Sequence, residues 1–539
     1  MVASSQPCGD SRPRLSGRAK LDSAVRPTDV RLVVTFFTLP PNSAITRTGS
    51  RYFARAHALN PTTSASLLPA FENQDELFSS AFSILRQAIT DRAFPAASIA
   101  VTHAGKLIAL KTFGRFKYEE NPGAPSLSRR SLARQGGDFD SDVTTLTLFD
   151  LASLTKVVAT TTMAMILYER GLLELDAPVA GLVPEFLASS AGPPDPRRRN
   201  VTFRMLLAHS SGLPAYEKLF LNAHTRDELL RAAFTTPLSA DPGSRAQYSD
   251  IGFIILGAAL ERLAEDPLDR FCQREIFGPL AMIHTTFNPP AEMRSQIPPT
   301  ADERKEVRVG PGRSLSRAQA RGPGQAARST AVPGGPQPPG ASPAHPRSTF
   351  RNRIIQGEVQ DENAFVLGGV AGHAGLFSTA EDLARFAHTM LQCGPGTPEC
   401  GAGTPFDSLR SLRAGSAREM PAAPASSSAS PKTAPGIFNP ILRPETVALF
   451  TRRESAPAGT SRALGWDTPS SPSQSGKYFS PSSFGHLGYT GTSLWIDPVR
   501  RLSITLLTNR TWPDCANQAI KQVRPQFHDA VMEALLDSA

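Results

Sequence analysis

Three short stretches of the sequence carry residue types whose spacing suits acyl transfer. The first is "SLTK", in which Ser153 and Lys156 stand three positions apart at the start of an apolar helix that we expect to end at Gly171. Residues with this spacing share one helix face, so the amine can reach the hydroxyl. An apolar setting and the positive end of the helix dipole would lower the lysine pKa and help it accept the serine proton. The alternative is that Ser153 and Thr155 only cap the helix while Lys156 is solvated.

The second stretch is "YSD", Tyr248 to Asp250, immediately before another apolar helix. A tyrosine in such a loop can act as a general base if a nearby cation lowers its pKa. The structural alternative is a buried Tyr248 with Asp250 as the helix N-cap. The two interpretations can hold together, because an N-cap at Asp250 would fix in place the loop that carries Tyr248.

The third stretch is "HLGYTG", a glycine-interrupted start to a strand. Gly488 and Gly491 let the backbone approach a ligand closely, and the Tyr489 N–H is a candidate oxyanion donor. His486 is a candidate for orienting a substrate carboxylate or for proton transfer near neutral pH. The alternative interpretation is that His486 is a structural histidine at a strand edge.

The elements that must position these stretches predict an α+β fold. Helical periodicity runs over 71–90 and 519–536, a β-hairpin is predicted over 96–116, and two further strands lie within 491–510. The middle of the chain, 150–395, is mostly helical by pattern. We therefore expect one antiparallel sheet built from both chain ends, flanked by N- and C-terminal helices, with an inserted mostly helical domain.

Composition divides the 539 residues into an arm and one folded domain. Residues 1–65 lack sustained periodicity and are expected to be a leader or a disordered arm. Residues 66–539 form the folded domain, with low-complexity inserts near 307–349, 394–436 and 467–482 that are rich in Pro, Gly, Ser, Ala and Arg. Such composition buries too little apolar surface to order itself, so we expect surface loops.

Several functional classes are disfavoured. The net charge of +9 comes largely from arginines in low-complexity segments, and no nucleic-acid-binding motif accompanies it, so no nucleic acid is expected. No apolar run is long enough for a transmembrane segment. No His, Cys or carboxylate cluster has metal spacing, so we predict no metal and no cofactor. His209 and His373 are expected to be structural, and Cys393 and Cys400 either close a small loop or stay unpaired.

In their order along the chain, the three stretches resemble the three motifs of the serine β-lactamase-like and penicillin-binding-protein-like hydrolases. The segments "LLAHSSGLP" and "GGVAGHAGLFSTAEDLARF" also look like the class C β-lactamase-related branch of this family. The resemblance spans 72–535 apart from the inserts, and it implies a β-lactamase/transpeptidase-like fold for the domain.

The resemblance also implies roles for individual residues. Ser153 would be the acylated nucleophile and Lys156 its activating base. Tyr248 would relay the proton to the leaving group and activate the deacylating water. The backbone N–H groups of Ser153 and Tyr489 would form the oxyanion hole.

Two positions depart from the family pattern. Asp250 stands where asparagine is usual, which adds a negative charge and removes amide donors that hold a substrate amide. His486 stands where lysine is usual, so the cation that grips a substrate carboxylate is weakened at neutral pH. Both departures resemble the esterase and peptidase members more than efficient antibiotic-degrading enzymes.

We therefore expect a serine hydrolase that cleaves an ester or amide, such as a β-lactam or small ester, through an acyl-enzyme on Ser153. One alternative is a D-alanyl-D-alanine carboxypeptidase or peptidase acting on peptidoglycan peptides, and another is a catalytically inert binding protein on the same fold. The expected partner is a small ester, β-lactam or D-amino-acid peptide, with the oligomeric state open. The resemblance implies a periplasmic or secreted location, but without a clear signal peptide a cytoplasmic one stays open.

Overall fold

The structure, a computed structural model, describes the chain in six segments. These are 67–118, 142–189, 192–304, 350–392, 441–513 and 515–537. The expected arm at 1–65 and the expected inserts at 307–349 and 394–436 lie outside the described residues, as do Cys393 and Cys400.

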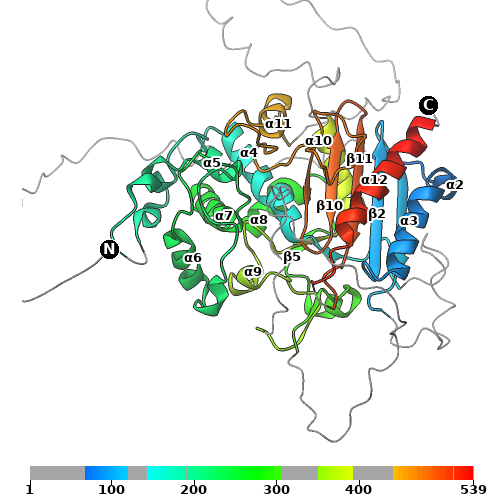
Figure 1. Cartoon of the computed structure of the whole chain (residues 1–539), viewed down its shortest axis with the longest axis horizontal. Helices are drawn as coiled ribbons and strands as arrows, with labels where there is room; N and C mark the ends of the chain where they lie inside the picture. The colour runs from blue at the N-terminus through cyan, green and yellow to red at the C-terminus, as the bar shows by residue number, and fades with distance from the viewer. Residues whose placement is uncertain are drawn as a thin grey trace, which may run out of the picture. The chain divides into compact units, whose positions relative to one another are not determined.

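A six-stranded sheet joins segments from the two ends of the chain, in the order β1-β3-β2-β11-β10-β9 (Figure 1). The strands are β1 (Leu68–Pro69), β2 (Ala96–His103), β3 (Lys106–Gly114), β9 (Phe484–Leu487), β10 (Ser493–Asp497) and β11 (Leu502–Thr508). All neighbours are antiparallel except β1 and β3, which are parallel. The central pair, β2 with β11, runs from His103 opposite Leu502 to Ala97 opposite Thr508. The predicted sheet assembled from both chain ends is confirmed.

Helices cover both faces of this sheet. On one face α3 (Ser79–Thr90) packs against α12 (Ile520–Asp537), and on the other lies α10 (Ala380–Gln392) (Figure 1). The single helix expected over 71–90 is interrupted, because α2 (Gln74–Leu77) ends at the fully buried Phe78 before α3 begins. The Phe78 ring packs 6.1 Å from that of Phe82, so tertiary packing overrides the helical periodicity at this point.

The chain between β3 and β9 is mostly helical, as expected. Its other helices are α4 (Thr162–Glu169), α5 (Phe203–Leu207), α6 (Arg226–Thr235), α7 (Asp250–Ala264), α8 (Leu268–Cys272), α9 (Glu362–Val366) and α11 (Pro444–Thr451). Two small sheets accompany them, β4 (Phe149–Asp150) with β8 (Leu376–Ser378) and β5 (Thr286–Phe287), and β6 (Ala301–Asp302) with β7 (Ile354–Ile355). Among the described residues no helix combines the length and the apolar character needed to cross a bilayer.

The segment 467–482 differs from the expectation of a surface loop that cannot order itself. It contains no helix or strand, yet Ser475, Phe479 and Ser480 are buried. The Ser480 N–H and hydroxyl both donate to the carboxylate of Asp497, at 2.9 and 2.8 Å. The Phe479 ring packs 5.9 Å from that of Trp495. Hydrogen bonds to the sheet therefore order a segment whose composition indicated disorder.

Candidate active site

A sharp bend in the backbone leads from β4 to Ser153. Ala152 has φ +47°, in the left-handed region that costs energy for any residue but glycine. The Asp150 carboxylate holds this bend, because it accepts from the N–H groups of Ala152 at 2.8 Å and Gln360 at 2.7 Å. Burial raises the pKa of Asp150 to about 6. The bend leaves Ser153 half-buried at the first turn of a helix.

The helix after this bend is continuous but irregular. A 3₁₀ turn over Ala152–Leu154 is followed by π-helical geometry over Lys156–Thr161 and then by α4. The chain leaves the helix at Gly171, whose φ of +68° suits the predicted end. π-helical turns are rare and occur frequently at functional sites.

Lys156 is fully buried beside Ser153, so the alternative of a solvated lysine is wrong. Its Nζ lies 3.0 Å from Ser153 Oγ, 2.7 Å from Asp250 Oδ1 and 3.0 Å from the His373 carbonyl oxygen. As a neutral amine it can donate its two N–H groups to the latter two oxygens and keep its lone pair for the serine proton. Burial lowers the pKa of Lys156, although Asp250 opposes that shift. The arrangement suits a base.

The Tyr248 hydroxyl donates to Ser153 Oγ at 2.7 Å. Burial first, and then the negative charge of Asp250, raise the pKa of Tyr248 well above its usual value. The prediction of a tyrosine with a lowered pKa is therefore wrong for the free protein. Burial and Asp250 outweigh the nearby cation Arg462, and Tyr248 is a neutral phenol that can give a proton.

Asp250 is the first residue of α7 and not its N-cap. Ser249 holds that position, because its hydroxyl accepts from the Gly252 N–H at 3.0 Å. The cap expected at Asp250 is thus one residue away, which leaves the Asp250 carboxylate free to bind Lys156. Their side chains are 13% and 0% exposed, so the protonated form of Lys156 makes a buried ion pair with Asp250, and the neutral form is the one that can act as a base.

The third motif forms a turn that is tied to the segment leading to Ser153. The Gly488 N–H donates to the Thr492 carbonyl at 2.8 Å and closes the turn. The hydroxyls of Thr490 and Thr492 donate to the carbonyl oxygens of Asp150 and Leu151, at 2.7 and 3.0 Å. These two bonds fix the backbone around Tyr489 relative to the bend.

His486 is buried in β9, with its ring 6.0 Å from that of Tyr248. Its Nδ1 lies 2.8 Å from the Leu487 carbonyl oxygen, so the neutral ring carries its proton there. Burial, followed by the charges of Lys156 and Arg462, lowers the pKa of His486 well below its usual value. The prediction that His486 titrates near neutral pH or supplies a weakened cation is therefore wrong, because burial keeps it neutral.

Comparison with known proteins places this chain in a family. The family model described as Beta-lactamase matches residues 82–524. The chain belongs to the beta-lactamase family. It is a serine hydrolase of that family, and the resemblance seen in the three motifs is confirmed.

Two relatives of this beta-lactamase-family hydrolase match most of their length. The chain is 29% identical over 432 residues to the N-acetylmuramyl-L-alanine amidase of Bacillus subtilis (strain 168), covering 77% of each chain. It is 30% identical over 383 residues to a putative D-alanyl-D-alanine carboxypeptidase of Escherichia coli (strain K12), covering 68% of this chain and 70% of the relative.

Solved structures confirm the fold of the family member. EstCE1, a hydrolase with promiscuous acyltransferase activity, aligns with a TM-score of 0.53 at 18% identity, over 85% of this chain and 99% of its own. A penicillin-binding protein homologue from Caulobacter crescentus aligns with a TM-score of 0.51 at 16% identity, over 87% of this chain and 99% of its own. Both show that this chain has the β-lactamase/transpeptidase-like α+β fold.

Two further histidines of the hydrolase support the site from outside. His209 accepts from the Ser249 N–H at 3.1 Å through Nδ1, and its ring lies 4.7 Å from that of Tyr248. The His373 ring lies 2.8 Å from Asp361 Oδ1 while its carbonyl oxygen binds Lys156. Both rings have the structural roles that the sequence predicts. The carbonyl contact of His373 was not predictable, because any residue type supplies a carbonyl.

Two other side chains at the site lie outside the three motifs. Asp150 holds the bend, and its place two residues before Ala152 in "FDLAS" was its only available sign. Arg462 lies with its guanidinium carbon 5.4 Å from the centre of the Tyr248 ring, and it belongs to no motif. Among the described residues no group of three or more His, Cys, Asp or Glu is placed to hold a metal ion.

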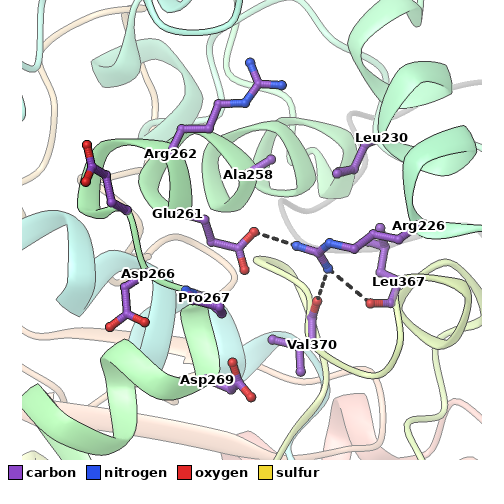
Figure 2. A pocket seen from close by; sticks show the side chains of 11 residues that line it. Arg226, Leu230, Ala258, Glu261, Arg262, Asp266, Pro267, Asp269, Leu367 and Val370 are labelled. Atoms are coloured by element: carbon purple, nitrogen blue, oxygen red, sulfur yellow. Dashed lines mark hydrogen bonds and ion pairs between the residues drawn. The ribbon is translucent and has the colours of Figure 1, made fainter.

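A separate cavity of about 540 Å³ lies between α6, α7 and the loop that carries Leu367 and Val370. Figure 2 shows Arg226 of α6 pointing toward Glu261 of α7, which it meets at 2.5 Å. The same guanidinium donates to the carbonyl oxygens of Leu367 and Val370 at 3.1 and 3.2 Å. Arg226 and Glu261 pair within the lining, whereas Arg262 and Asp266 pair with residues outside it. The lining includes none of the three motifs, so we place no chemistry there.

Replacing Gly488 with alanine is expected to displace the turn away from Ser153. An added Cβ would lie 1.9 Å from Thr492 Oγ1 and 2.5 Å from the Leu151 carbonyl oxygen. We expect a loss of about 1–3 kcal/mol in the free energy of unfolding and a fall in kcat of about 10²-fold. Urea unfolding and ester kinetics measure the two effects. Gly181→Ala, where a Cβ meets nothing within 4 Å, is the control, and equal behaviour of both variants would contradict the prediction.

His486→Gln is expected to have a kcat/KM profile whose inflections lie at the same pH as in the wild type, between about pH 5.5 and 8. The reason is that the lowered pKa keeps His486 neutral across that whole range. Ester hydrolysis measured across the range tests this. An inflection that is present in the wild type and lost in His486→Gln would show that the histidine titrates.

Proposed function

We propose that this serine hydrolase cleaves an ester or amide through a covalent acyl-enzyme on Ser153. The observation that carries the proposal is the position of Ser153 Oγ, 3.0 Å from Lys156 Nζ and 2.7 Å from the Tyr248 hydroxyl. A nucleophile within hydrogen-bond reach of one group that accepts a proton and another that gives one is the arrangement nucleophilic catalysis requires.

In acylation the neutral Lys156 amine takes the proton of Ser153 as Oγ forms a bond to the substrate carbonyl carbon. The backbone N–H groups of Ser153 and Tyr489 hold the oxyanion that results. As the tetrahedral intermediate collapses, Tyr248 gives its proton to the leaving oxygen or nitrogen. Tyr248 is reprotonated from Lys156, so the serine proton ends on the leaving group.

In deacylation a water molecule attacks the acyl carbon and the same two groups move its proton. The neutral Lys156 amine takes the proton from the water, either directly or through Tyr248, which gives its own proton to Lys156 as it accepts that of the water. Lys156 then returns a proton to Ser153 Oγ as the bond between Oγ and the acyl carbon breaks. The products are a carboxylic acid and the free hydrolase. The substrate of this cycle is a small molecule or peptide, and no nucleic acid takes part.

The second candidate is D-alanyl-D-alanine carboxypeptidase activity on peptidoglycan peptides. The name of the Escherichia coli relative, 30% identical over 383 residues, favours it. The same acyl-enzyme would then form on a peptide carbonyl with D-alanine as the leaving group.

Parallel incubations with p-nitrophenyl butyrate, a fluorescent penicillin and a peptide ending in D-alanyl-D-alanine separate these candidates. We expect ester hydrolysis, with an acyl adduct in the intact mass that maps to the peptide containing Ser153. Release of D-alanine would select the carboxypeptidase, and penicillin turnover would add β-lactamase activity. Absence of both turnover and adduct with all three compounds would overturn the proposal.

Asp250→Asn is expected to move the acid limb of the kcat/KM profile to lower pH. The Asp250 charge raises the pKa of Lys156 against the effect of burial, so its removal lets the neutral amine persist at lower pH. A charge partner at this distance typically shifts a pKa by about 1–3 units, which sets the expected displacement. Rates from about pH 4 to 9 measure it.

The control for Asp250→Asn is Asp227→Asn, which removes a carboxylate from the exposed face of α6. It should leave the limb in place. A limb that stays fixed or moves to higher pH in Asp250→Asn would mean that Lys156 does not set it.

A further inference from the structure

Arg510 is buried behind the turn that carries Tyr489. It lies just after the end of β11 at Thr508 and is 5% exposed. Its Nε donates to the Tyr489 carbonyl oxygen at 2.7 Å, and its guanidinium carbon lies 4.5 Å from the centre of the Tyr489 ring. One side chain therefore contacts both the backbone and the ring of the residue whose N–H is the proposed oxyanion donor.

The N–H of Tyr489 itself is free. Within the described part of the chain it has no hydrogen-bond acceptor. A free backbone N–H can serve an oxyanion only if the residue that carries it is held in place by other contacts. The Tyr489 carbonyl oxygen makes such a contact, and Arg510 is the side chain that donates to it.

The guanidinium of Arg510 is also anchored away from the turn. Its Nη1 donates to the carbonyl oxygens of Cys515 and Asn517, at 3.1 and 3.2 Å. The backbone N–H of Arg510 and the Thr508 hydroxyl both donate to the Thr490 carbonyl oxygen at 2.9 Å. Arg510 therefore connects the turn to the segment that follows β11.

The turn packs directly on the aliphatic part of this side chain. Gly491 has φ +95°, and an added Cβ there would lie 2.6 Å from Arg510 Cγ and 2.1 Å from Thr508 Oγ1. Because the packing leaves no room between the turn and Arg510, a change in this side chain is expected to move the turn.

The environment of Arg510 desolvates its charge. Burial lowers the pKa of Arg510, and backbone carbonyl oxygens together with the Tyr489 ring replace the water that a surface arginine keeps. The planar fork of N–H donors bridges acceptors on two segments, which a short polar or an apolar side chain could not do. That bridge accounts for the presence of an arginine here.

We propose that Arg510 is a positioning residue of the oxyanion hole, which holds Tyr489 so that its N–H points to the place where the oxyanion forms. The inference rests on the proposed function, because it assumes acyl transfer at Ser153. An oxyanion donor stabilises the transition state only when it is preorganised at hydrogen-bond distance. Loss of the Arg510 contacts should therefore lower kcat and leave KM nearly unchanged.

Two esters that differ in one atom report on the oxyanion hole. In the tetrahedral intermediate p-nitrophenyl butyrate carries its negative charge on oxygen, whereas its thiono analogue, with C=S in place of C=O, carries it on sulfur. Sulfur accepts hydrogen bonds weakly, and its longer bond to carbon displaces it from the donors. In the wild type, kcat/KM should therefore be about 10²–10³-fold higher for the oxygen ester.

Arg510→Met should lower kcat for the oxygen ester by about 10–100-fold and leave the thiono ester nearly unaffected. The ratio of kcat/KM between the two esters then falls by the same factor. A purely structural effect of the substitution would reduce the folded fraction and slow both esters equally, so it would not change the ratio.

Arg198→Met is the matched control. Arg198 is 2% exposed, lies over the Phe186 ring and donates to the backbone carbonyl oxygens of Phe186, Phe234 and Thr236. None of these residues belongs to the three motifs. The control should lower stability, as the loss of Arg510 does, and it should keep the wild-type ratio.

The outcomes separate this inference from the proposed function. Absence of oxygen-ester turnover by the wild type would overturn the proposed function. Turnover that depends on Ser153 but is equal for both esters would overturn the role of Arg510 and leave the acyl-enzyme mechanism intact. The same conclusion would follow from an unchanged ratio in Arg510→Met, or from an equal fall of the ratio in Arg198→Met.

Arg510→Lys covers the case in which Arg510→Met does not fold. Lysine keeps the charge and an aliphatic stem, but its single nitrogen lacks the planar fork that bridges the carbonyl oxygens of Tyr489, Cys515 and Asn517. The ratio should fall by about 5-fold or more. A wild-type ratio in Arg510→Lys would then contradict the proposal.

Discussion

Ser153→Ala is expected to lower kcat for ester hydrolysis by about 10⁴–10⁶-fold, as loss of the nucleophile does in other serine hydrolases. The substitution removes the oxygen to which both Lys156 and Tyr248 are hydrogen-bonded. No other hydroxyl is bonded to both groups among the described residues, so none can replace it. The acyl adduct should disappear from the intact mass spectrum together with the activity.

Ser80→Ala is the matched control, since it removes an exposed hydroxyl from α3. It should keep both the wild-type rate and the adduct. Ester hydrolysis that survives in Ser153→Ala, or an adduct that maps to another residue, would contradict the proposed nucleophile.

Lys156→Met is expected to abolish turnover and also to destabilise the fold. The Asp250 carboxylate would stay in place without the cation that binds it at 2.7 Å, and removal of one partner of a buried ion pair costs about 3–5 kcal/mol. The folded fraction of the variant should also be slower, because it lacks the base. We expect its kcat to fall by about 10³-fold or more. Urea unfolding gives the stability change, and ester kinetics on the remaining folded protein give the rate.

The double variant Lys156→Met with Asp250→Asn separates these two effects. Removing the stranded charge should recover most of the lost free energy of unfolding, because the carboxylate becomes a neutral amide. It should not recover the rate, because the base is still absent. If activity returns with stability, Lys156 holds the site together and is not its base.

The three motifs could be predicted because each is local in the sequence. Ser153 and Lys156 meet through helix geometry alone, and Tyr248 and Tyr489 belong to short stretches with recognisable neighbours. The sheet was also predictable, because the two hairpins show strand alternation and lie at opposite ends of the chain.

The electrostatics of the site could not be predicted in this way. The pKa of Tyr248 depends on burial and on the distance to Asp250, and neither follows from the "YSD" pattern. His486 is neutral because the interior of the protein desolvates it. The contacts of Arg462 and of the His373 carbonyl depend on tertiary packing that no local pattern encodes. Sequence therefore identified the groups that we propose to react, and the structure was needed to assign their charges.

The pairing of β2 with β11 has a consequence for biosynthesis. The hydroxyls of Thr102 and Ser503, 401 positions apart in the chain, meet at 2.6 Å across these two strands. Sheets that depend on such distant pairings form late, because the loop between the partners must close first. A nascent chain that already contains Ser153 and Lys156 still lacks the turn at Tyr489, which leaves the ribosome hundreds of residues later. During synthesis Ser153 therefore lacks the proposed oxyanion donor at Tyr489 until the chain has been made past that turn.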